Sequence, residues 1–151
     1  AIDSFYKGKA LGSIGHLAAF SFHETKNIIC GEGGLLVVND EKRVKRSEIL
    51  WEKGTNRAEF YRGMVNKYQW CDLGSSFLPS EFNAAYLWAQ LEQLDDIQNK
   101  RKHIWQMYYE GLQGQVGTHV RLPFIPDYAT NNANMFYLVC DTLDYRTRLM
   151  N

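Results

Sequence analysis

The chain has 151 residues, with 17 basic and 17 acidic side chains and therefore no formal net charge. This balance argues against nonspecific electrostatic binding to nucleic acid or to an anionic membrane, because such binding needs a surplus or a cluster of basic residues. Apolar residues make up 45% and charged residues 23% of the sequence, as in globular rather than disordered chains. No uncharged stretch approaches the about 20 apolar residues that a membrane-spanning helix needs.

Three cysteines, Cys30, Cys71 and Cys140, form no C-x-x-C pair. They fit neither a disulfide framework nor a zinc site, and the histidines have no metal-ligand spacing with carboxylates. We therefore expect no metal and a reducing, cytoplasmic location. The sequence starts at Ala1 without an initiator Met and ends in what reads as the first turns of a helix, which predicts a piece of a longer protein.

Two apolar runs near the N-terminus predict buried strands. They span residues 16–22 and 34–39, and such near-continuous apolar sequence is typical of strands covered on both faces in an α/β protein. Asp40 then suits the N-cap of a helix that ends at Gly54. Residues 55–78 are aromatic, charged and rich in turn formers, which predicts a long functional loop.

The second half of the chain begins with the pattern of a long helix. Pro79 suits its first position, and apolar residues recur at helical spacing to about residue 112. A helix of about thirty residues is long for a globular domain, so we expect a bend near the charged patch at 98–103. Strands are predicted at 120–124 and 135–140. The predicted class is α/β, with a change of subdomain near the start of the long helix.

The segment Ser21–Asn27, followed by the glycine-rich turn 31–34, carries the most chemistry. A lysine in a tight loop after a buried strand loses hydration, which lowers its pKa and frees the amine as nucleophile and base. The Ser21 hydroxyl and the backbone N–H groups of the turn suit an anion. A surface lysine before an ordinary Gly-rich turn fits the same residues, because both features are common. The residue types alone leave both interpretations open.

The sequence AFSFHETKNIICGEGGLLVVND at 19–40 resembles the lysine loop of the DegT/DnrJ/EryC1/StrS family of sugar aminotransferases. The similarity continues in YKGKALGSIGH before it and in KGTNRAEFYRG and LGSSFLPSEFNAAYLWAQLE after it, over roughly residues 5 to 93. The resemblance implies part of the fold-type-I PLP-dependent transferase fold, whose large domain has a mostly parallel sheet. Residues 1–78 would be the C-terminal part of the large PLP-binding domain, and residues 79–151 the long helix and the N-terminal part of the small domain.

The resemblance also implies an activity. Lys26 would hold pyridoxal 5′-phosphate as a Schiff base and then move protons as general base and acid. The combination GTNR, GSS and LPSE is most similar to the branch that moves an amino group from L-glutamate to the 4-keto carbon of a dTDP-4-keto-6-deoxy sugar, giving dTDP-4-amino-4,6-dideoxygalactose for lipopolysaccharide. Such enzymes are homodimers. The alternative is an idle PLP-fold fragment that only dimerises or binds a nucleotide sugar.

Other site residues follow from the resemblance position by position. Ser21 matches the residue whose hydroxyl contacts the cofactor phosphate, although a strand-end hydroxyl also satisfies local backbone. His23 either touches substrate or cofactor or only buttresses the loop. Asn56 and Arg57 suit a substrate carboxylate or diphosphate, since guanidinium binds anions in a bidentate manner, or else they lie in a solvated loop.

Two departures from the family pattern qualify these expectations. The acid that pairs with the pyridine nitrogen would lie upstream of residue 1, and Asp3 does not match it. Many members send an asparagine to the cofactor phosphate of the neighbouring subunit, where this chain has Gly74–Leu78, so Ser75 or Ser76 would substitute. We therefore expect the 151 residues by themselves to bind the cofactor weakly and to be inactive.

Overall fold

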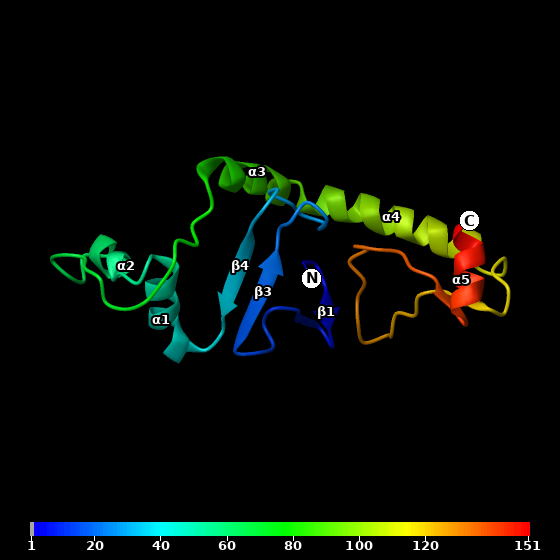
Figure 1. Ribbon diagram of the computed structural model, residues 1–151, viewed down its shortest axis with the longest axis horizontal. Helices are drawn as coiled ribbons and strands as arrows, with labels where there is room; N and C mark the ends of the chain where they lie inside the picture. Colours follow the sequence, from blue (N-terminus) through cyan, green and yellow to red (C-terminus); the bar gives the residue numbers. More distant parts are fainter. Residues whose placement is uncertain (1) are drawn as a thin grey trace.

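The elements are strung along one long, broken helix in the computed structural model, which describes residues 2–151 (Figure 1). The C-terminal segment turns back beneath this helix towards the N-terminal strands (Figure 1). In chain order the elements are β1 (Phe5–Tyr6), β2 (Lys9–Ala10), β3 (Leu17–Ser21), β4 (Gly34–Val38), α1 (Glu41–Trp51), α2 (Arg57–Tyr61), α3 (Glu81–Glu92), α4 (Leu94–Leu112), β5 (Val120–Arg121), β6 (Val139–Cys140) and α5 (Leu143–Met150).

The two predicted N-terminal strands are confirmed as β3 and β4, but they pair antiparallel, from Leu17 opposite Val38 to Ser21 opposite Gly34. The connection between them holds no helix. A parallel pair needs a crossover, usually helical, so these two strands are not parallel neighbours in the sheet. Burial on both faces is also not seen in this chain, because Leu35 and Leu36 are exposed.

Helix α1 forms where the sequence predicts it. The Asp40 side chain accepts a hydrogen bond from the Lys42 N–H at 3.1 Å, as an N-cap does. The chain leaves the helix through Gly54, whose φ of +77° is readily adopted only by glycine. The expected loop 55–78 is not one loop, because it contains α2 and folds back onto α1 through the bridges Thr55–Trp70 and Glu52–Ser76. We call residues 41–76 the arm.

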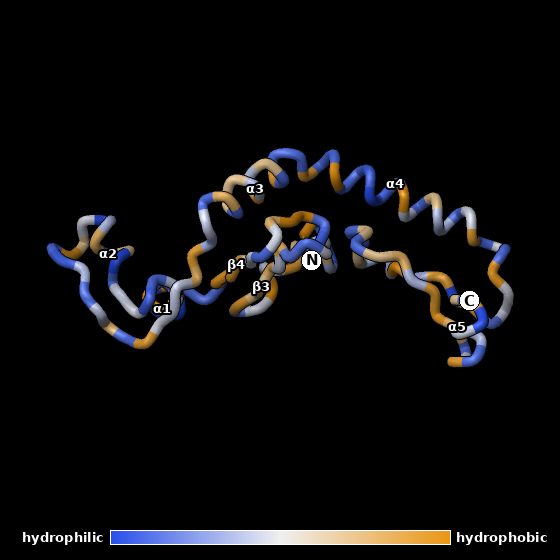
Figure 2. Tube along the Cα trace, turned by 45° about the horizontal axis from the view of Figure 1, so that its top comes forward, coloured by the Kyte–Doolittle hydropathy of each residue, from blue (hydrophilic) through white to orange (hydrophobic). Residues whose placement is uncertain are grey.

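The long helical stretch differs from its prediction at two points. It begins with Ser80 as N-cap, whose Oγ accepts from the Asn83 N–H at 3.2 Å, so Pro79 lies before the helix rather than at its first position. It breaks at Gln93, where φ is −106° and ψ is 18°, and not at the charged patch. Hydrophobic residues recur along α4 and alternate with polar ones (Figure 2).

The remaining strands are short. β5 ends before Pro123, which cannot donate a ladder hydrogen bond, and β6 covers only the last two residues of its predicted run. The hairpin β1–β2 was missed by the pattern analysis because each strand has two residues. Its turn, Lys7–Gly8, has positive φ at both positions, the geometry of a type I′ turn. None of the helices within residues 2–151 combines the length and the apolar character needed to cross a membrane.

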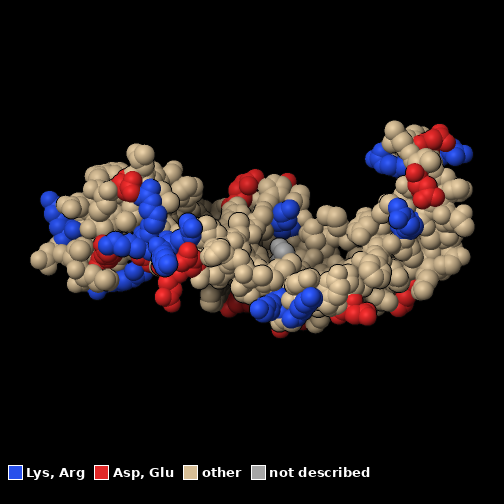
Figure 3. All heavy atoms as spheres, turned by 90° about the horizontal axis from the view of Figure 1, so that it is seen from below, with Lys and Arg blue, Asp and Glu red and all other residues tan. Residues whose placement is uncertain are grey.

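The core is small and sits where the Lys26 loop meets the helices. Phe22, Ile28 and Cys30 are buried, with Ile28 only 1% exposed. Against them pack the partly buried Ile2, Phe20, Leu87, Leu94 and Ile97. Large apolar side chains elsewhere stay exposed, Phe82 by 88% among them. Charged side chains of both signs crowd the arm, where Lys45–Glu59 and Arg62–Glu48 form ion pairs (Figure 3).

Candidate active site

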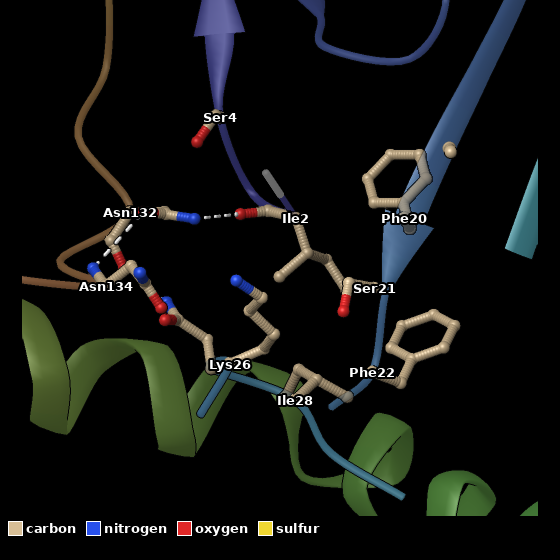
Figure 4. A pocket seen from close by; sticks show the side chains of 11 residues that line it. Ile2, Ser4, Phe20, Ser21, Phe22, Lys26, Ile28, Asn132 and Asn134 are labelled. Atoms are coloured by element: carbon tan, nitrogen blue, oxygen red, sulfur yellow. Dashed lines mark hydrogen bonds between the residues drawn. The ribbon is translucent and has the colours of Figure 1, made fainter. Parts of the chain in front are cut away.

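A pocket of about 380 Å³ lies between the lysine loop, the N-terminal segment and the turn at 132–134 (Figure 4). We call it the lysine pocket. The Lys26 side chain extends into it, with the Ser21 side chain on one side and Asn132 on the other (Figure 4). Its lining consists of Ile2, Ser4, Ala19, Phe20, Ser21, Phe22, Lys26, Asn27, Ile28, Asn132 and Asn134.

Backbone hydrogen bonds fix the loop that presents Lys26. The Lys26 N–H donates to the His23 carbonyl at 2.9 Å, and the Cys30 N–H donates to the Phe22 carbonyl at 2.8 Å. Buried Ile28 anchors the far side of the loop. Lys26 itself is exposed in this chain, so the loss of hydration expected from the sequence is not observed. The loop therefore offers a positioned amine in an open pocket.

Ser21 shares the pocket with Lys26. Its Oγ accepts a hydrogen bond from the His23 N–H at 3.4 Å, so the hydroxyl satisfies local backbone. A hydroxyl that accepts one hydrogen bond still has its own hydrogen to donate. Local bonding and contact with an anion are therefore compatible at this position.

His23 is engaged inside the loop instead of lining the pocket. Its Nδ1 lies 3.0 Å from the Thr25 Oγ1, and its Nε2 lies 3.5 Å from the Glu32 Oε1. Both ring nitrogens thus have partners within the loop, one just before Lys26 and one in the glycine-rich turn. This geometry favours the buttressing role for His23.

The two arm residues predicted to bind substrate lie away from the lysine pocket in this chain. The Asn56 Oδ1 accepts from the Gln69 N–H at 2.8 Å and ties α2 to the following segment. The Arg57 guanidinium donates to the Tyr61 hydroxyl at 2.7 Å and lies over that ring, with its carbon 5.1 Å from the ring centroid. The helices α1 and α2 of the arm lie at one end of the molecule, away from the N-terminal strand β1 and the end of β3 (Figure 1), and none of the described residues that line the pocket belongs to the arm.

Ser75 and Ser76 also belong to the arm. The Ser75 N–H donates to the Leu50 carbonyl at 3.0 Å, and its carbonyl accepts from the Lys53 N–H at 3.1 Å. Ser76 forms an isolated bridge with Glu52. Both serines are held beside α1, and neither lines the lysine pocket.

Sequence reasoning missed the far wall of the pocket, which comes from a segment more than a hundred residues from Lys26. The Asn132 Nδ2 donates to the Ile2 carbonyl at 3.0 Å, and the Asn134 N–H donates to the Asn132 Oδ1 at 3.2 Å. Ala133 between them has a φ of +53°. The run Asn-Asn-Ala-Asn at 131–134 was the available signal, because asparagine favours such turns.

A buried polar network closes the back of the pocket. Gln98 on α4 accepts from the Asn27 Nδ2 at 2.7 Å and donates to the Asp3 Oδ2 at 3.1 Å. The Lys102 Nζ lies 2.6 Å from the same Asp3 oxygen. Burial acts to raise the pKa of Asp3, but the hydrogen bonds from Lys102 and Gln98 and the charge of Lys102 together lower that pKa below its ordinary value.

The lowered pKa of Asp3 predicts a pH-dependent stability. Asp3 is more acidic folded than unfolded, so its contribution is present above its unfolded pKa and is lost as pH falls through its folded pKa. We use the term native polypeptide for the protein that contains these 151 residues. In it, Lys102→Met should lower the free energy of unfolding by about 1 kcal/mol at pH 7, a small effect because Lys102 is largely exposed. Urea unfolding at pH 7 and pH 3 should show that the difference in free energy of unfolding between the wild type and Lys102→Met is smaller at pH 3. The exposed Lys100→Met on the same helix is the control, and a deficit of equal size at both pH values would contradict this account.

A lysine and a neighbouring hydroxyl in one pocket of an α/β chain suit a carbonyl cofactor that carries a phosphate. The fold itself matches solved structures over nearly the whole chain. The protein AtS13 from Actinomadura melliaura has a TM-score of 0.80 at 25% identity, covering 99% of this chain and 39% of its own. The sugar aminotransferase CalS13 from Micromonospora echinospora has a TM-score of 0.78 at 23% identity, covering 98% of this chain and 39% of its own.

The sequence comparison gives the family. The profile of the DegT/DnrJ/EryC1/StrS aminotransferase family matches residues 1–151, so the chain belongs to this family of PLP-dependent enzymes. It is 31% identical over 144 residues to spore coat polysaccharide biosynthesis protein SpsC of Bacillus subtilis, covering 93% of this chain and 36% of that protein. It is 35% identical over 120 residues to GDP-perosamine synthase of Escherichia coli O157:H7, covering 79% of this chain and 31% of that protein. The chain thus spans about a third of the length of these relatives.

The lysine pocket fits one part of the family's cofactor. Lys26 offers the amine that a pyridoxal aldehyde needs, and Ser21 offers a hydroxyl for its phosphate. None of the pocket-lining residues, all within 2–151, is a carboxylate that could face a pyridine nitrogen. The pocket therefore offers groups that suit the aldehyde and the phosphate, and none among its described residues that suits the pyridine nitrogen.

Proposed function

We propose that the native polypeptide is a PLP-dependent sugar aminotransferase. It moves an amino group from L-glutamate to the 4-keto carbon of a dTDP-4-keto-6-deoxy sugar. The observation that carries this proposal is the extension of Lys26, at the family's motif position, into a pocket shared with Ser21. Relatives named for spore coat polysaccharide and for GDP-perosamine support an amino sugar destined for a cell-surface polysaccharide.

In this proposal Lys26 and Ser21 hold pyridoxal 5′-phosphate, which when bound supplies the electron sink for charge developing on the substrate carbon. Lys26 has two tasks. Its Nζ would anchor the cofactor, and once freed by the incoming amine it would carry a proton from the substrate carbon to the cofactor carbon that the lysine had occupied. The backbone hydrogen bonds of the loop fix the position from which the Lys26 side chain enters the pocket.

We further propose a homodimer in which the arm reaches a second copy. The arm's predicted ligands, Asn56, Arg57, Ser75 and Ser76, lie away from the pocket of their own chain. Exposed aromatic side chains on the arm and on the start of α3, such as Trp70 and Phe82, would be covered by the contact. In this arrangement residues 1–78 belong to the large domain and residues 79–151 to the helix and the small domain.

The proposal is tested in two half-reactions with the native polypeptide loaded with pyridoxal 5′-phosphate. L-glutamate alone should convert the cofactor to its amine form, seen as loss of visible absorbance with release of 2-oxoglutarate. Addition of dTDP-4-keto-6-deoxyglucose should restore the absorbance. If only the GDP-linked keto sugar restores the absorbance, the substrate carries GDP instead of dTDP. If neither sugar restores it, the proposal is contradicted.

A further inference from the structure

Gln98 is a polar side chain in a place where helices bury apolar ones. It is 2% exposed, and of the residues of α4, all within the described chain, it alone is buried. A buried amide costs free energy unless its hydrogen bonds are made. Both polar atoms of Gln98 are satisfied: its Oε1 accepts from Asn27, and its Nε2 donates to the Asp3 carboxylate and to the Asn132 carbonyl, the last at 3.2 Å.

The ion pair at one end of this network determines which way each amide points. Lys102 holds Asp3 as a carboxylate, which can only accept hydrogen bonds. Gln98 must therefore present its NH₂ group to Asp3 and its oxygen to Asn27. Asn27 in turn must present its NH₂ group to Gln98, and the same group also donates to the Asn132 carbonyl at 2.6 Å.

This chain of amides ends on an unused acceptor. Asn27 is 4% exposed, and its Oδ1 is buried without a hydrogen-bond partner among the described residues. An unpaired buried acceptor is costly, so an arrangement that enforces one calls for a ligand that supplies the donor. Asn27 lines the lysine pocket and directly follows Lys26, which makes a donor held at Lys26 the candidate partner for this oxygen.

We propose that Gln98 is a positioning residue for the lysine pocket: it orients Asn27 so that the Asn27 carbonyl oxygen accepts a hydrogen bond from a protonated nitrogen held at Lys26. This inference rests on the proposed function, because the nitrogen is that of the cofactor-bearing lysine. The oxygen stabilises the protonated form of that nitrogen. Loss of the contact makes the nitrogen easier to deprotonate.

The test uses the native polypeptide loaded with pyridoxal 5′-phosphate and follows the visible absorbance of the lysine-bound cofactor against pH. Asn27→Ala and Gln98→Met should each lower the pH at which half of the lysine-bound cofactor is deprotonated by about half to one unit. A shift of this size corresponds to the loss of one hydrogen bond. The double variant should shift no further than Asn27→Ala alone, since Gln98 acts through Asn27. The control is Gln106→Met, because Gln106 lies on the same helix but is exposed and donates to Glu110.

A second readout needs no cofactor. Amide hydrogen exchange of residues 22–31 in the apo protein should become faster in Gln98→Met and stay unchanged in Gln106→Met. If Gln98→Met does not fold, Gln98→Asn carries both measurements, because it keeps the amide and is too short to reach Asn27.

The outcomes separate the two proposals. An unshifted midpoint in a Gln98 variant, or additive shifts in the double variant, would overturn the positioning role while leaving the proposed function in place. Absence of lysine-bound absorbance in the wild-type protein would instead contradict the proposed function, and unchanged exchange of residues 22–31 in Gln98→Met would then overturn the positioning role as well.

Discussion

Lys26→Ala is expected to reduce turnover of the native polypeptide by at least about a thousandfold, because one side chain provides covalent anchoring, general base and general acid. The fold should survive the change. The Lys26 backbone N–H, not its side chain, closes the loop on His23, and the side chain is exposed. Steady-state kinetics give the loss of activity, and circular dichroism with thermal unfolding checks that the variant is folded.

Lys100→Ala is the matched control, since Lys100 is also an exposed lysine and lies on α4, outside both the arm and the pocket lining. It should keep wild-type turnover. A Lys26→Ala protein that retains even about a tenth of wild-type activity would contradict the assignment, because general acid–base catalysis alone is worth about a hundredfold or more.

Gly54→Ala is expected to destabilise the arm by about 3 kcal/mol, the scale at which backbone clashes unfold local structure. Gly54 has a φ of +77°, and a Cβ there would fall on the Asp72 carbonyl oxygen and lie 2.8 Å from its carbon. The Gly54 carbonyl also accepts from the Cys71 N–H at 2.7 Å and from the Asp72 N–H at 3.0 Å. Relieving the clash would therefore break the contact that holds residues 71–74 against the end of α1.

The control for Gly54 is Gly63, which has a similar φ of +71° but nothing within 4 Å of its added Cβ. Gly63→Ala should lower the free energy of unfolding by only about 1 to 2 kcal/mol, because the only penalty there is that of an alanine in the left-handed conformation. Urea unfolding gives the free energies, and hydrogen exchange of residues 52–56 and 69–76 locates the loss. Equal costs at the two glycines would show that the backbone contact is unimportant.

Local features of the fold were predictable from the sequence because local residues determine them. The strands β3 and β4, the Asp40 cap and the exit at Gly54 each follow from a few neighbouring residues. The lysine loop was found by its motif, and the structure adds that Lys26 extends into a pocket together with Ser21.

Long-range features were not predictable. Asn132 meets the lysine loop across more than a hundred residues, and no local pattern encodes that contact. The sequence placed Gln98 in a charged patch, and its burial could not be predicted because that burial depends on Asp3 and Asn27, which come from the far end of the chain. The break at Gln93 was also missed, since no proline or glycine marks it.

The most direct test of the central claim is to reduce the native polypeptide with borohydride in the presence of pyridoxal 5′-phosphate and to map the modified peptide by mass spectrometry. Reduction makes the link between lysine and cofactor permanent. The account predicts a single pyridoxyl group on Lys26, which Lys26→Ala abolishes and L-glutamate added before reduction prevents. Labelling spread over other lysines, or labelling of Lys26 that L-glutamate does not prevent, would contradict the assignment of Lys26 as the catalytic lysine of an aminotransferase.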